Sequence, residues 1–326
     1  MKAIVYNKYG NPDDLQLKSV TKPQPKSNEV LIKVHAASIN SWDWDLLKGH
    51  HFIVRLLSGW FKPKNKILGA DVAGVVEKVG DTVQTFKPGD EVFGDIADAG
   101  FGAFAEYVAV PEKLLAKKSS ALSFEQAAAL PQAGLLALQG LRYKKPLHQG
   151  EHLLINGAGG GVGTIALTYA KGIGATVTCV DKASKFELLH SLGADELIDY
   201  TKEDYTRNGK QYDYILDVTA HRSIADYKRA LKPGGVFCMI GGSMGGLLLK
   251  FALFSPLISK MSGKHLGLMG YRPSKEYLEE LAQLFTENKI AIIIDKVFSL
   301  EETPAAFRHF ESGNFVGKIV IRVEPL

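Results

Sequence analysis

The chain has 326 residues, of which 46% are apolar and 23% are charged, and its formal net charge is +4. This composition is typical of a folded globular protein, and the length fits two domains better than one small module. The positive charge is spread along the chain without a run of five like charges, so it gives no reason to expect a nucleic acid partner. It would suit an anionic small ligand, but on charge alone an ordinary solvated surface is the better explanation.

The two cysteines, Cys179 and Cys238, both lie in apolar, strand-like stretches. Two thiols exclude a disulfide framework and a four-thiolate zinc site, and buried cysteines usually behave as small apolar residues. The N-terminal MKAIVYNKYG lacks the apolar core of a secretory signal, which predicts a cytoplasmic protein. The longest apolar region, 244–258, is interrupted by glycine, lysine and proline, so no membrane span is predicted.

The first 120 residues contain short strand-like runs separated by turn residues, which predicts a compact, mostly antiparallel β domain. These runs are KAIVY, LQLKSV, EVLIKVHAASIN, AGVVEKVG, EVFGDI and FAEYVAV.

Residues 42–66 are aromatic, basic and weakly helical in period, and they are too many for a plain turn. We interpret them as a lid. A membrane-surface helix is the less favoured alternative, because Gly49, Gly59 and Pro63 interrupt the period. The aromatic side chains of this segment offer a flat surface for a substrate, and packing against the β domain explains them equally well.

From residue 123 onward, helices and strands alternate. The stretch FEQAAALPQAGLLALQGL predicts a helical connector that bends or restarts at Pro131. Continuous apolar strands separated by helices then predict a parallel sheet covered on both faces. The last helices and the strand GKIVIRV indicate a return to the first domain. We therefore predict an α/β fold, with a doubly wound domain at 123–265 inserted into a split β domain of residues 1–122 and 266–326.

A glycine-rich loop lies directly between the strand HLLIN and a helix. It runs through Asn156, Gly157, Ala158, Gly159, Gly160, Gly161, Val162 and Gly163. Counted back from Gly163, it is a variant of the dinucleotide fingerprint with alanine in the first position. Glycines there allow a tight turn, close approach of a pyrophosphate and close packing of the helix, whose N-terminus attracts anions. The loop predicts nucleotide binding. A ligand-free glycine turn is the weaker alternative in this setting.

The residues after the second predicted strand leave the choice of nucleotide open. Asp181 ends that strand close to the ~20-residue distance at which an acid binds ribose hydroxyls, which favours NAD. Lys182, Ser184 and Lys185 follow at once, and ammonium and hydroxyl groups there suit a 2′-phosphate. Asp181 could instead cap the next helix, and the lysines could simply be solvent-exposed. Tyr200 could line the adenosine end of the site, or belong to the core or the surface.

Together these motifs resemble the medium-chain dehydrogenase/reductases and, within them, the zinc-independent quinone oxidoreductase branch. The resemblance covers nearly the whole chain. It rests on AASIN at 36–40, LGADVAGVVEKVG at 68–80, KPGDEVFG at 87–94, Leu130-Pro131, the glycine loop, LGAD at 192–195 with Tyr200, LKPGG at 231–235 and Gly317-Lys318. It implies a groES-like catalytic domain and a Rossmann domain that hold a nicotinamide in a cleft. It also implies use of NADPH, reduction of quinones or conjugated enals and enones, and a homodimer.

The resemblance also predicts a catalytic centre without zinc. Catalytic zinc enzymes of the family place a cysteine where this chain has Asn40, and a His-Glu pair where it has Ala70 and Asp71. The adjacent His50 and His51 more plausibly belong to the surface or the lid. Hydrogen bonds must then polarise the substrate carbonyl in place of a Lewis acid.

Asn40 is the candidate polar group near the nicotinamide, where its amide would orient the carboxamide or the substrate oxygen. Asp43 is the candidate proton donor, because an acid in an apolar cleft has a raised pKa, although capping of the following helical turn explains it better. Gly241 and Lys318 are further expected cofactor contacts. Leu136 stands where relatives often carry threonine, which removes one hydroxyl contact.

The predicted activity is transfer of a hydride from NAD(P)H to a quinone or to the β-carbon of an enone. Two alternatives stay open at this point. One is a metal-free alcohol or aldehyde oxidoreductase. The other is a non-catalytic protein that holds the nucleotide as a redox sensor.

Overall fold

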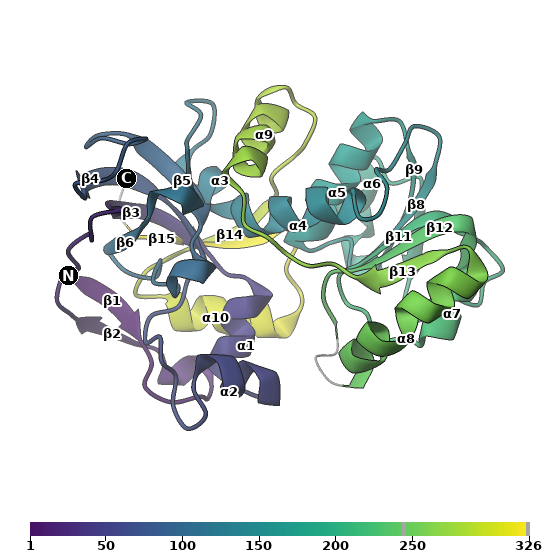
Figure 1. The fold of residues 1–326 in the computed structure, drawn as a ribbon, viewed down its shortest axis with the longest axis horizontal. Coiled ribbons are helices and arrows are strands. Elements are labelled where there is room, and N and C mark those ends of the chain that lie inside the picture. The colour runs from purple at the N-terminus through teal and green to yellow at the C-terminus, as the bar shows by residue number, and fades with distance from the viewer. Residues whose placement is uncertain (243–245, 324–326) are drawn as a thin grey trace. The chain divides into compact units, whose positions relative to one another are not determined.

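A computed structural model describes residues 1–242 and 246–323 of the chain (Figure 1). Its internal contacts divide the chain into two units. Unit 1 comprises Met1–Leu135, Pro273–Thr286 and Ile292–Leu326, and unit 2 comprises Leu136–Arg272 and Glu287–Ala291. The domain limits at 122/123 and 265/266 stay a prediction.

Unit 1 is built on a mostly antiparallel sheet. Its strand order is β14-β15-β3-β4-β5-β7, β6 pairs with β3, and of these described pairs only β14–β15 is parallel. A separate antiparallel pair joins β1 and β2. The bounds are β1 Lys2–Val5, β2 Gln16–Ser19, β3 Glu29–Ser38, β4 Asp71–Val79, β5 Glu91–Asp95, β6 Tyr107–Pro111, β7 Leu115–Lys117, β14 Ile294–Ser299 and β15 Lys318–Arg322. The predicted mostly-β domain is confirmed, while β7 and β14 were not among the predicted strands.

The helices of unit 1 begin and end at residues that their sequence explains. The predicted helical connector is two helices: α3 is capped by reciprocal bonds between Ser123 and Gln126, and a new helix starts at Pro131. In the 42–66 segment two short helices form, and the first ends at Gly49, whose φ of 57° is left-handed. The bounds are α1 Ser41–Lys48, α2 Phe52–Ser58, α3 Phe124–Ala129, α4 Pro131–Leu141, α9 Lys275–Thr286 and α10 Thr303–Ser312, with α4 running across the division between the units.

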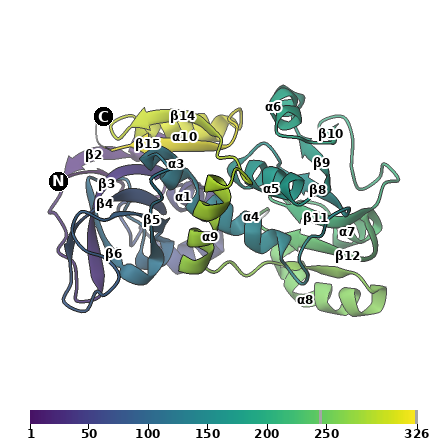
Figure 2. The same ribbon diagram turned by 90° about the horizontal axis from the view of Figure 1, so that it is seen from above.

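Unit 2 is a doubly wound α/β domain. Its six strands are all parallel, in the order β10-β9-β8-β11-β12-β13, which is the Rossmann order 3-2-1-4-5-6. Helices α5 and α6 cover one face of the sheet, and α7 and α8 cover the other (Figure 2). The bounds are β8 His152–Asn156, β9 Thr176–Asp181, β10 Glu196–Asp199, β11 Tyr212–Asp217, β12 Leu231–Met239, β13 His265–Leu268, α5 Gly161–Gly172, α6 Phe186–Ser191, α7 Ile224–Ala230 and α8 Gly246–Ser262. The predicted doubly wound fold is confirmed.

Aromatic packing holds α7 and α8 on their face of the unit 2 sheet. The ring of Phe237 on β12 stacks on Tyr227 of α7 at 4.0 Å and on Phe251 of α8 at 5.3 Å between ring centroids. All three side chains are fully buried, so they contribute both apolar burial and ring contacts. Within the described residues, no helix is long and apolar enough for a membrane crossing.

Candidate active site

The glycine loop joins β8 to α5 and is fastened to the neighbouring strand β9. The amides of Gly157 and Ala158 both donate to the carbonyl of Val180, at 3.0 and 3.2 Å. Gly157 has a φ of 82°, a left-handed conformation that suits glycine. Gly160 then stands at the N-cap of α5. The glycine loop therefore lies between a strand and a helix, as predicted from the sequence, at the carboxyl edge of the parallel sheet.

Two glycines of the loop serve different purposes. A Cβ added to Gly163 would lie 2.4 Å from the carbonyl oxygen and 2.5 Å from the Cα of Ala158, so glycine is needed there for the helix to pack on the loop. A Cβ added to Gly160 would meet no described atom closer than 3.7 Å. The fold itself therefore does not require glycine at position 160. The first N–H groups of an α-helix lack intrahelical partners, so this open side is suited to bind a phosphate.

Asp181 holds the loop in place. Its side chain is almost fully buried, and its Oδ2 accepts a 2.7 Å hydrogen bond from the amide of Gly159. Its Oδ1 accepts from the amide of Lys182 at 2.8 Å and lies 3.4 Å from the Lys185 ammonium. The following short helices have Lys182 and Lys185 as their N-caps, so the alternative that Asp181 caps the next helix is not observed. Asp181 instead carries a carboxylate whose charge is already compensated.

The other residues predicted at the ribose end gather at the same edge of the sheet. Tyr200 directly follows Asp199, which is paired in register with Asp181, and its side chain is 45% exposed. The Lys185 side chain is largely buried beside the loop, where its Cδ would lie 2.4 Å from a Cβ on Gly159. Lys182 is half-buried in the same turn. The structure therefore places Asp181 and Lys185 against the glycine loop, and Lys182 and Tyr200 follow strand ends at the same edge of the sheet.

The sequence analysis missed Asp217, at the end of β11. This fully buried carboxylate accepts hydrogen bonds from Asn156 Nδ2 at 2.8 Å and from the Tyr205 hydroxyl at 3.0 Å. Burial raises its pKa, against the lowering effect of these bonds. The amide of Thr219 also donates to it, at 3.0 Å. An acid that ends a buried apolar strand, in YDYILD, was the available signal.

Gly241 lies close to the chain that continues from β11. Its carbonyl accepts the amide of Ala220 at 3.1 Å, and a Cβ at this position would lie only 2.5 Å from the Val218 carbonyl oxygen. Glycine is therefore required by backbone packing at this point. A contact of Gly241 with the cofactor stays a prediction.

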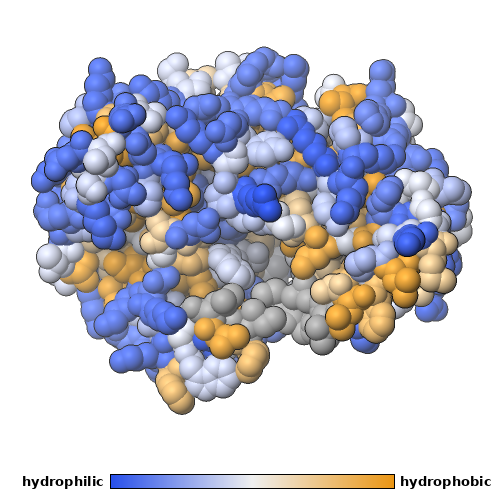
Figure 3. All heavy atoms as spheres, viewed as in Figure 1, coloured by the Kyte–Doolittle hydropathy of each residue, from blue (hydrophilic) through white to orange (hydrophobic). Residues whose placement is uncertain are grey.

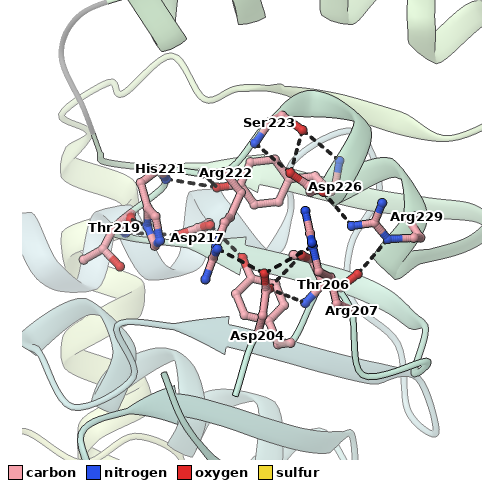
Figure 4. A network of polar contacts seen from close by, with 12 residues as sticks. Asp204, Thr206, Arg207, Asp217, Thr219, His221, Arg222, Ser223, Asp226 and Arg229 are labelled. Carbon is pink, nitrogen blue, oxygen red and sulfur yellow. Dashed lines mark hydrogen bonds and ion pairs between the residues drawn. The ribbon is translucent and has the colours of Figure 1, made fainter. Parts of the chain in front are cut away.

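A polar network steadies the segment that follows Asp217 (Figure 4). The Arg222 guanidinium pairs with Asp204 at 3.0 Å, and the amides of His221 and Arg222 both donate to the Tyr227 hydroxyl. Ser223 and Asp226 cap the start of α7, and Arg229 Nε donates to the Thr206 carbonyl at 2.9 Å. These contacts tie residues 204–207 to the chain that enters α7, next to the carboxyl ends of the strands.

In unit 1, Asn40, Asp71 and Lys318 meet in a buried network. The Asp71 side chain is fully buried, and its Oδ2 accepts from Ser38 Oγ at 2.9 Å and from Asn40 Nδ2 at 3.0 Å. The Lys318 ammonium lies 3.3 Å from the same oxygen. The amide of Gln132 donates to Asp71 Oδ1 at 3.0 Å. Each charge is therefore paired and hydrogen-bonded, which a buried ion pair requires.

Lys318 orients the amide of Asn40. Its ammonium donates to Asn40 Oδ1 and, at 3.1 Å, to the carbonyl of Ile39. Of the two Nδ2 hydrogens of Asn40, one goes to Asp71, and the described structure records no acceptor for the other. The contacts of Asn40 and Lys318 with a nicotinamide stay predictions.

Asp43 is fully buried near the start of α1. Its carboxylate accepts from the amide of Asn40 at 3.0 Å and from the amide of Gly69 at 2.8 Å. Burial raises its pKa to about 7, with the two amide donors opposing that rise. The N-cap of α1 is Asn40, and Asp43 supports the cap from the third helical position. Its role as proton donor stays a prediction.

The described residues contain no group of three or more His, Cys, Asp or Glu side chains placed to hold a metal ion. At the position where zinc enzymes of the family carry a glutamate, Asp71 instead pairs with an ammonium. The absence of zinc from the working enzyme stays a prediction.

The chain combines a Rossmann unit that has an open glycine loop with a mostly antiparallel β unit, which is the domain composition of two-domain nicotinamide-dependent oxidoreductases. Family models agree: residues 26–120 match the alcohol dehydrogenase GroES-like domain, and residues 192–321 match the family named zinc-binding dehydrogenase. The chain belongs to the medium-chain dehydrogenase/reductase family, in its zinc-independent quinone oxidoreductase branch. The predicted family, fold class and enzymatic class of NAD(P)H-dependent oxidoreductase are thus confirmed.

Curated relatives match along the whole chain. A 2-methylene-furan-3-one reductase from Solanum lycopersicum is 36% identical, over 100% of this chain and 80% of the relative. A chloroplastic NADPH-dependent alkenal/one oxidoreductase from Arabidopsis thaliana is 33% identical, with the same coverage. A mitochondrial NAD(P)H oxidoreductase from Mus musculus is 32% identical, over 99% of this chain and 89% of the relative.

Solved structures give the same result. The quinone oxidoreductase of Coxiella burnetii is 31% identical, with a TM-score of 0.85 over 99% of each chain. The quinone oxidoreductase of Escherichia coli in complex with NADPH is 25% identical, with a TM-score of 0.85 over 99% of this chain and 100% of that one.

The predicted cytoplasmic location is wrong on these comparisons. The Arabidopsis relative is named as chloroplastic and the mouse relative as mitochondrial. The sequence argument tested only for the apolar core of a secretory signal. Organelle-targeting segments are amphipathic and would not show such a core.

Proposed function

We propose that this protein is an NADPH-dependent reductase of quinones or α,β-unsaturated carbonyl compounds. The observation that carries the proposal is the open space beside Gly160 at the start of α5. The fold does not require glycine at this position, whereas close approach of a dinucleotide pyrophosphate does. The names of the tomato and Arabidopsis relatives, an enone reductase and an alkenal/one oxidoreductase, support the substrate class.

The compensated charge of Asp181 supports NADPH over NADH. A free carboxylate at this position would repel a 2′-phosphate, but Asp181 is bonded to two backbone amides and faces the Lys185 ammonium. Lys185, Lys182 and the Tyr200 hydroxyl are the groups that would hold the phosphate. NADH remains the cofactor that Asp181 would favour if Lys185 moved away.

The reaction is expected to depend on positioning and hydrogen bonding. Bound NADPH supplies the hydride. The N–H groups at the start of α5 hold the pyrophosphate, and the Asn40 amide, fixed by Lys318 and Asp71, directs its remaining hydrogen toward a ligand oxygen. Negative charge that develops on the substrate oxygen is stabilised by such preorganised donors. The proton comes from water or from Asp43.

NADPH consumption with quinones, enones, aldehydes and alcohols tests the proposal. We expect turnover with quinones or enones. Turnover restricted to alcohols and aldehydes, or tight NADPH binding without any turnover, would refute it. Asn40→Ala should slow single-turnover hydride transfer about tenfold or more while NADPH affinity stays within about twofold. An unchanged single-turnover rate would exclude the role of the Asn40 amide.

We also propose that the chain forms a homodimer through unit 2. Strand β13 is the edge strand of the sheet, and Leu268 on it is 40% exposed. The adjoining helix α8 exposes Leu253 and Leu257 to 62% and 59%. An uncovered edge strand beside apolar side chains favours pairing with a second copy. Light scattering of the purified chain measures this directly, and a monomer mass at micromolar concentration would contradict it.

A further inference from the structure

An exposed apolar surface covers α2 and the loop that follows it. Its members, which we call the aromatic patch, are Phe52, Leu56, Trp60 and Phe61, exposed to 64%, 59%, 47% and 90%. The Phe52 and Trp60 rings meet edge to face at 5.2 Å, so the helix and the loop form one continuous surface. Figure 3 shows apolar side chains over α2, with hydrophilic ones beside them on the left of the view. A phenylalanine that is 90% exposed has almost no packing partner, so packing against the β domain does not explain the Phe61 side chain.

The protein holds the aromatic patch in a defined shape. The amide of Lys64 donates to the Ser58 carbonyl at 2.7 Å and closes the loop that carries Trp60 and Phe61. The Tyr9 hydroxyl donates to the Gly59 carbonyl at 2.5 Å and lies 2.9 Å from Ser58 Oγ. Gly59 itself has a φ of 117°. A Cβ added at Gly59 would lie only 2.2 Å from the carbonyl oxygen of Lys62, so only glycine allows this close approach. The two exposed rings therefore project from an anchored turn.

The charged side chains of the segment that carries the patch have one sign. Between Asp45 and Asp71 the sequence contains no acidic residue, whereas it contains Lys48, Arg55, Lys62, Lys64 and Lys66. Arg55 and the last three lysines are exposed. For Lys62, Lys64 and Lys66, no ion pair with a carboxylate is recorded in the described part of the chain. The chain as a whole has nearly balanced charges, 39 basic and 35 acidic residues, so this segment departs from its average.

We propose that the aromatic patch, with the lysines that flank it, docks on the surface of an anionic lipid bilayer. Trp and Phe rings are favoured at the boundary between headgroups and acyl chains, and Lys side chains reach lipid phosphates while their stems stay on the apolar side. Each Lys or Arg near an anionic surface adds further attraction, which salt screens. A protein partner of matching acidity is the alternative occupant, and the experiment below separates the two. The segment lies on the surface and does not cross the membrane.

Co-sedimentation with lipid vesicles tests the docking. We expect the full chain to bind phosphatidylcholine vesicles that contain about 30% phosphatidylglycerol at least tenfold more tightly than pure phosphatidylcholine, with most of the difference lost at about 0.5 M salt. Trp60→Ser with Phe61→Ser should reduce binding to the anionic vesicles about tenfold or more. Lys62→Gln with Lys64→Gln should do the same without changing the residual binding to neutral vesicles.

Matched controls separate the patch from general charge and apolarity. Lys18→Gln with Lys202→Gln removes two exposed lysines elsewhere and should bind like the wild type. Leu17→Ser removes an exposed apolar side chain on β2, outside the aromatic patch and the proposed dimer interface, and should also retain binding. All substituted side chains are exposed, so NADPH binding and the circular dichroism spectrum should be unchanged. Absence of wild-type binding to anionic vesicles, equal loss with the control lysines, or equal loss with Leu17→Ser would each overturn the proposal.

Discussion

Replacing Lys318 by methionine should destabilise unit 1 specifically. The substitution keeps most of the side-chain volume and removes the ammonium, which leaves the fully buried Asp71 carboxylate without its cation. The Ile39 carbonyl and Asn40 Oδ1 lose their donor at the same time. Removing one partner of a buried ion pair typically costs about 3–5 kcal/mol. Asp71 keeps three hydrogen-bond donors, so the lower half of that range is expected.

Tryptophan fluorescence makes this prediction measurable for unit 1 alone. All three tryptophans, Trp42, Trp44 and Trp60, belong to that unit. A loss of about 3–4 kcal/mol should lower the fluorescence-detected melting temperature by roughly 6–16 °C. Lys296→Met removes an exposed lysine from the paired strand β14 and should shift the melting temperature by no more than about 2 °C.

A double-mutant cycle distinguishes the ion pair from lost packing. Asp71→Asn combined with Lys318→Met should destabilise unit 1 by less than the sum of the two single changes, with a coupling of about 1 kcal/mol or more. If Lys318→Met alone costs less than about 1 kcal/mol, or if the two changes are additive, the buried pair does not stabilise the unit in the way its geometry indicates.

Four further substitutions probe the two sites. Gly163→Ala should lower the free energy of unfolding by about 1–3 kcal/mol, because the added Cβ meets the Ala158 backbone. Gly160→Val should leave the circular dichroism melting curve unchanged and weaken NADPH binding about tenfold or more. Equal effects of the two variants on stability would contradict this distinction. In fluorescence titrations, Lys185→Gln should weaken NADPH binding about tenfold and NADH binding about twofold or less, with Lys202→Gln as the control. An equal loss of affinity for both nucleotides would instead indicate damage to the loop. Burial raises the pKa of Asp43 from 3.8 to about 7. The contribution of this group to the free energy of unfolding is therefore fully present below pH 3.8. It falls by about 1.4 kcal/mol per pH unit as the pH rises toward 7. Urea unfolding of Asp43→Asn between pH 5 and 8 should lack this slope, and identical slopes would refute it.

The elements with strong local signals could be predicted from the sequence. Continuous apolar strands followed by helices identified the doubly wound sheet, and the glycines between β8 and α5 placed the nucleotide loop. Pro131 was predicted to bend or restart the connector helix, and in the structure a new helix begins there. The two missed strands have weaker patterns. β7 has only three residues, and Val297 and Phe298 are the only adjacent apolar residues of β14. Edge strands bury little surface, so their periodicity is faint.

The internal partners of the site residues could not be predicted, because they are distant in sequence. Asp71 and Lys318 are 247 residues apart, and no local spacing relates them. Motif matching named Asn40 and Lys318 separately, as cofactor contacts, while the structure shows that they bond to each other. Asp217 escaped notice for a related reason: its partners Asn156 and Tyr205 come from a neighbouring strand and from a loop.

The pairing of β15 with β3 has a consequence for the order in which the polypeptide assembles on the ribosome. Strand β3 is made early, but Val320 and Ile321, which face it across the sheet, are synthesised only after all of unit 2. Unit 2 contains almost its entire length in one uninterrupted stretch and can mature while the nascent chain is still growing. Until β15 has been synthesised, strand β3 lacks this neighbour and Asp71 lacks its cation. A premature stop just before Lys318 would therefore leave a finished nucleotide-binding unit attached to an unfinished β unit, which proteases would degrade.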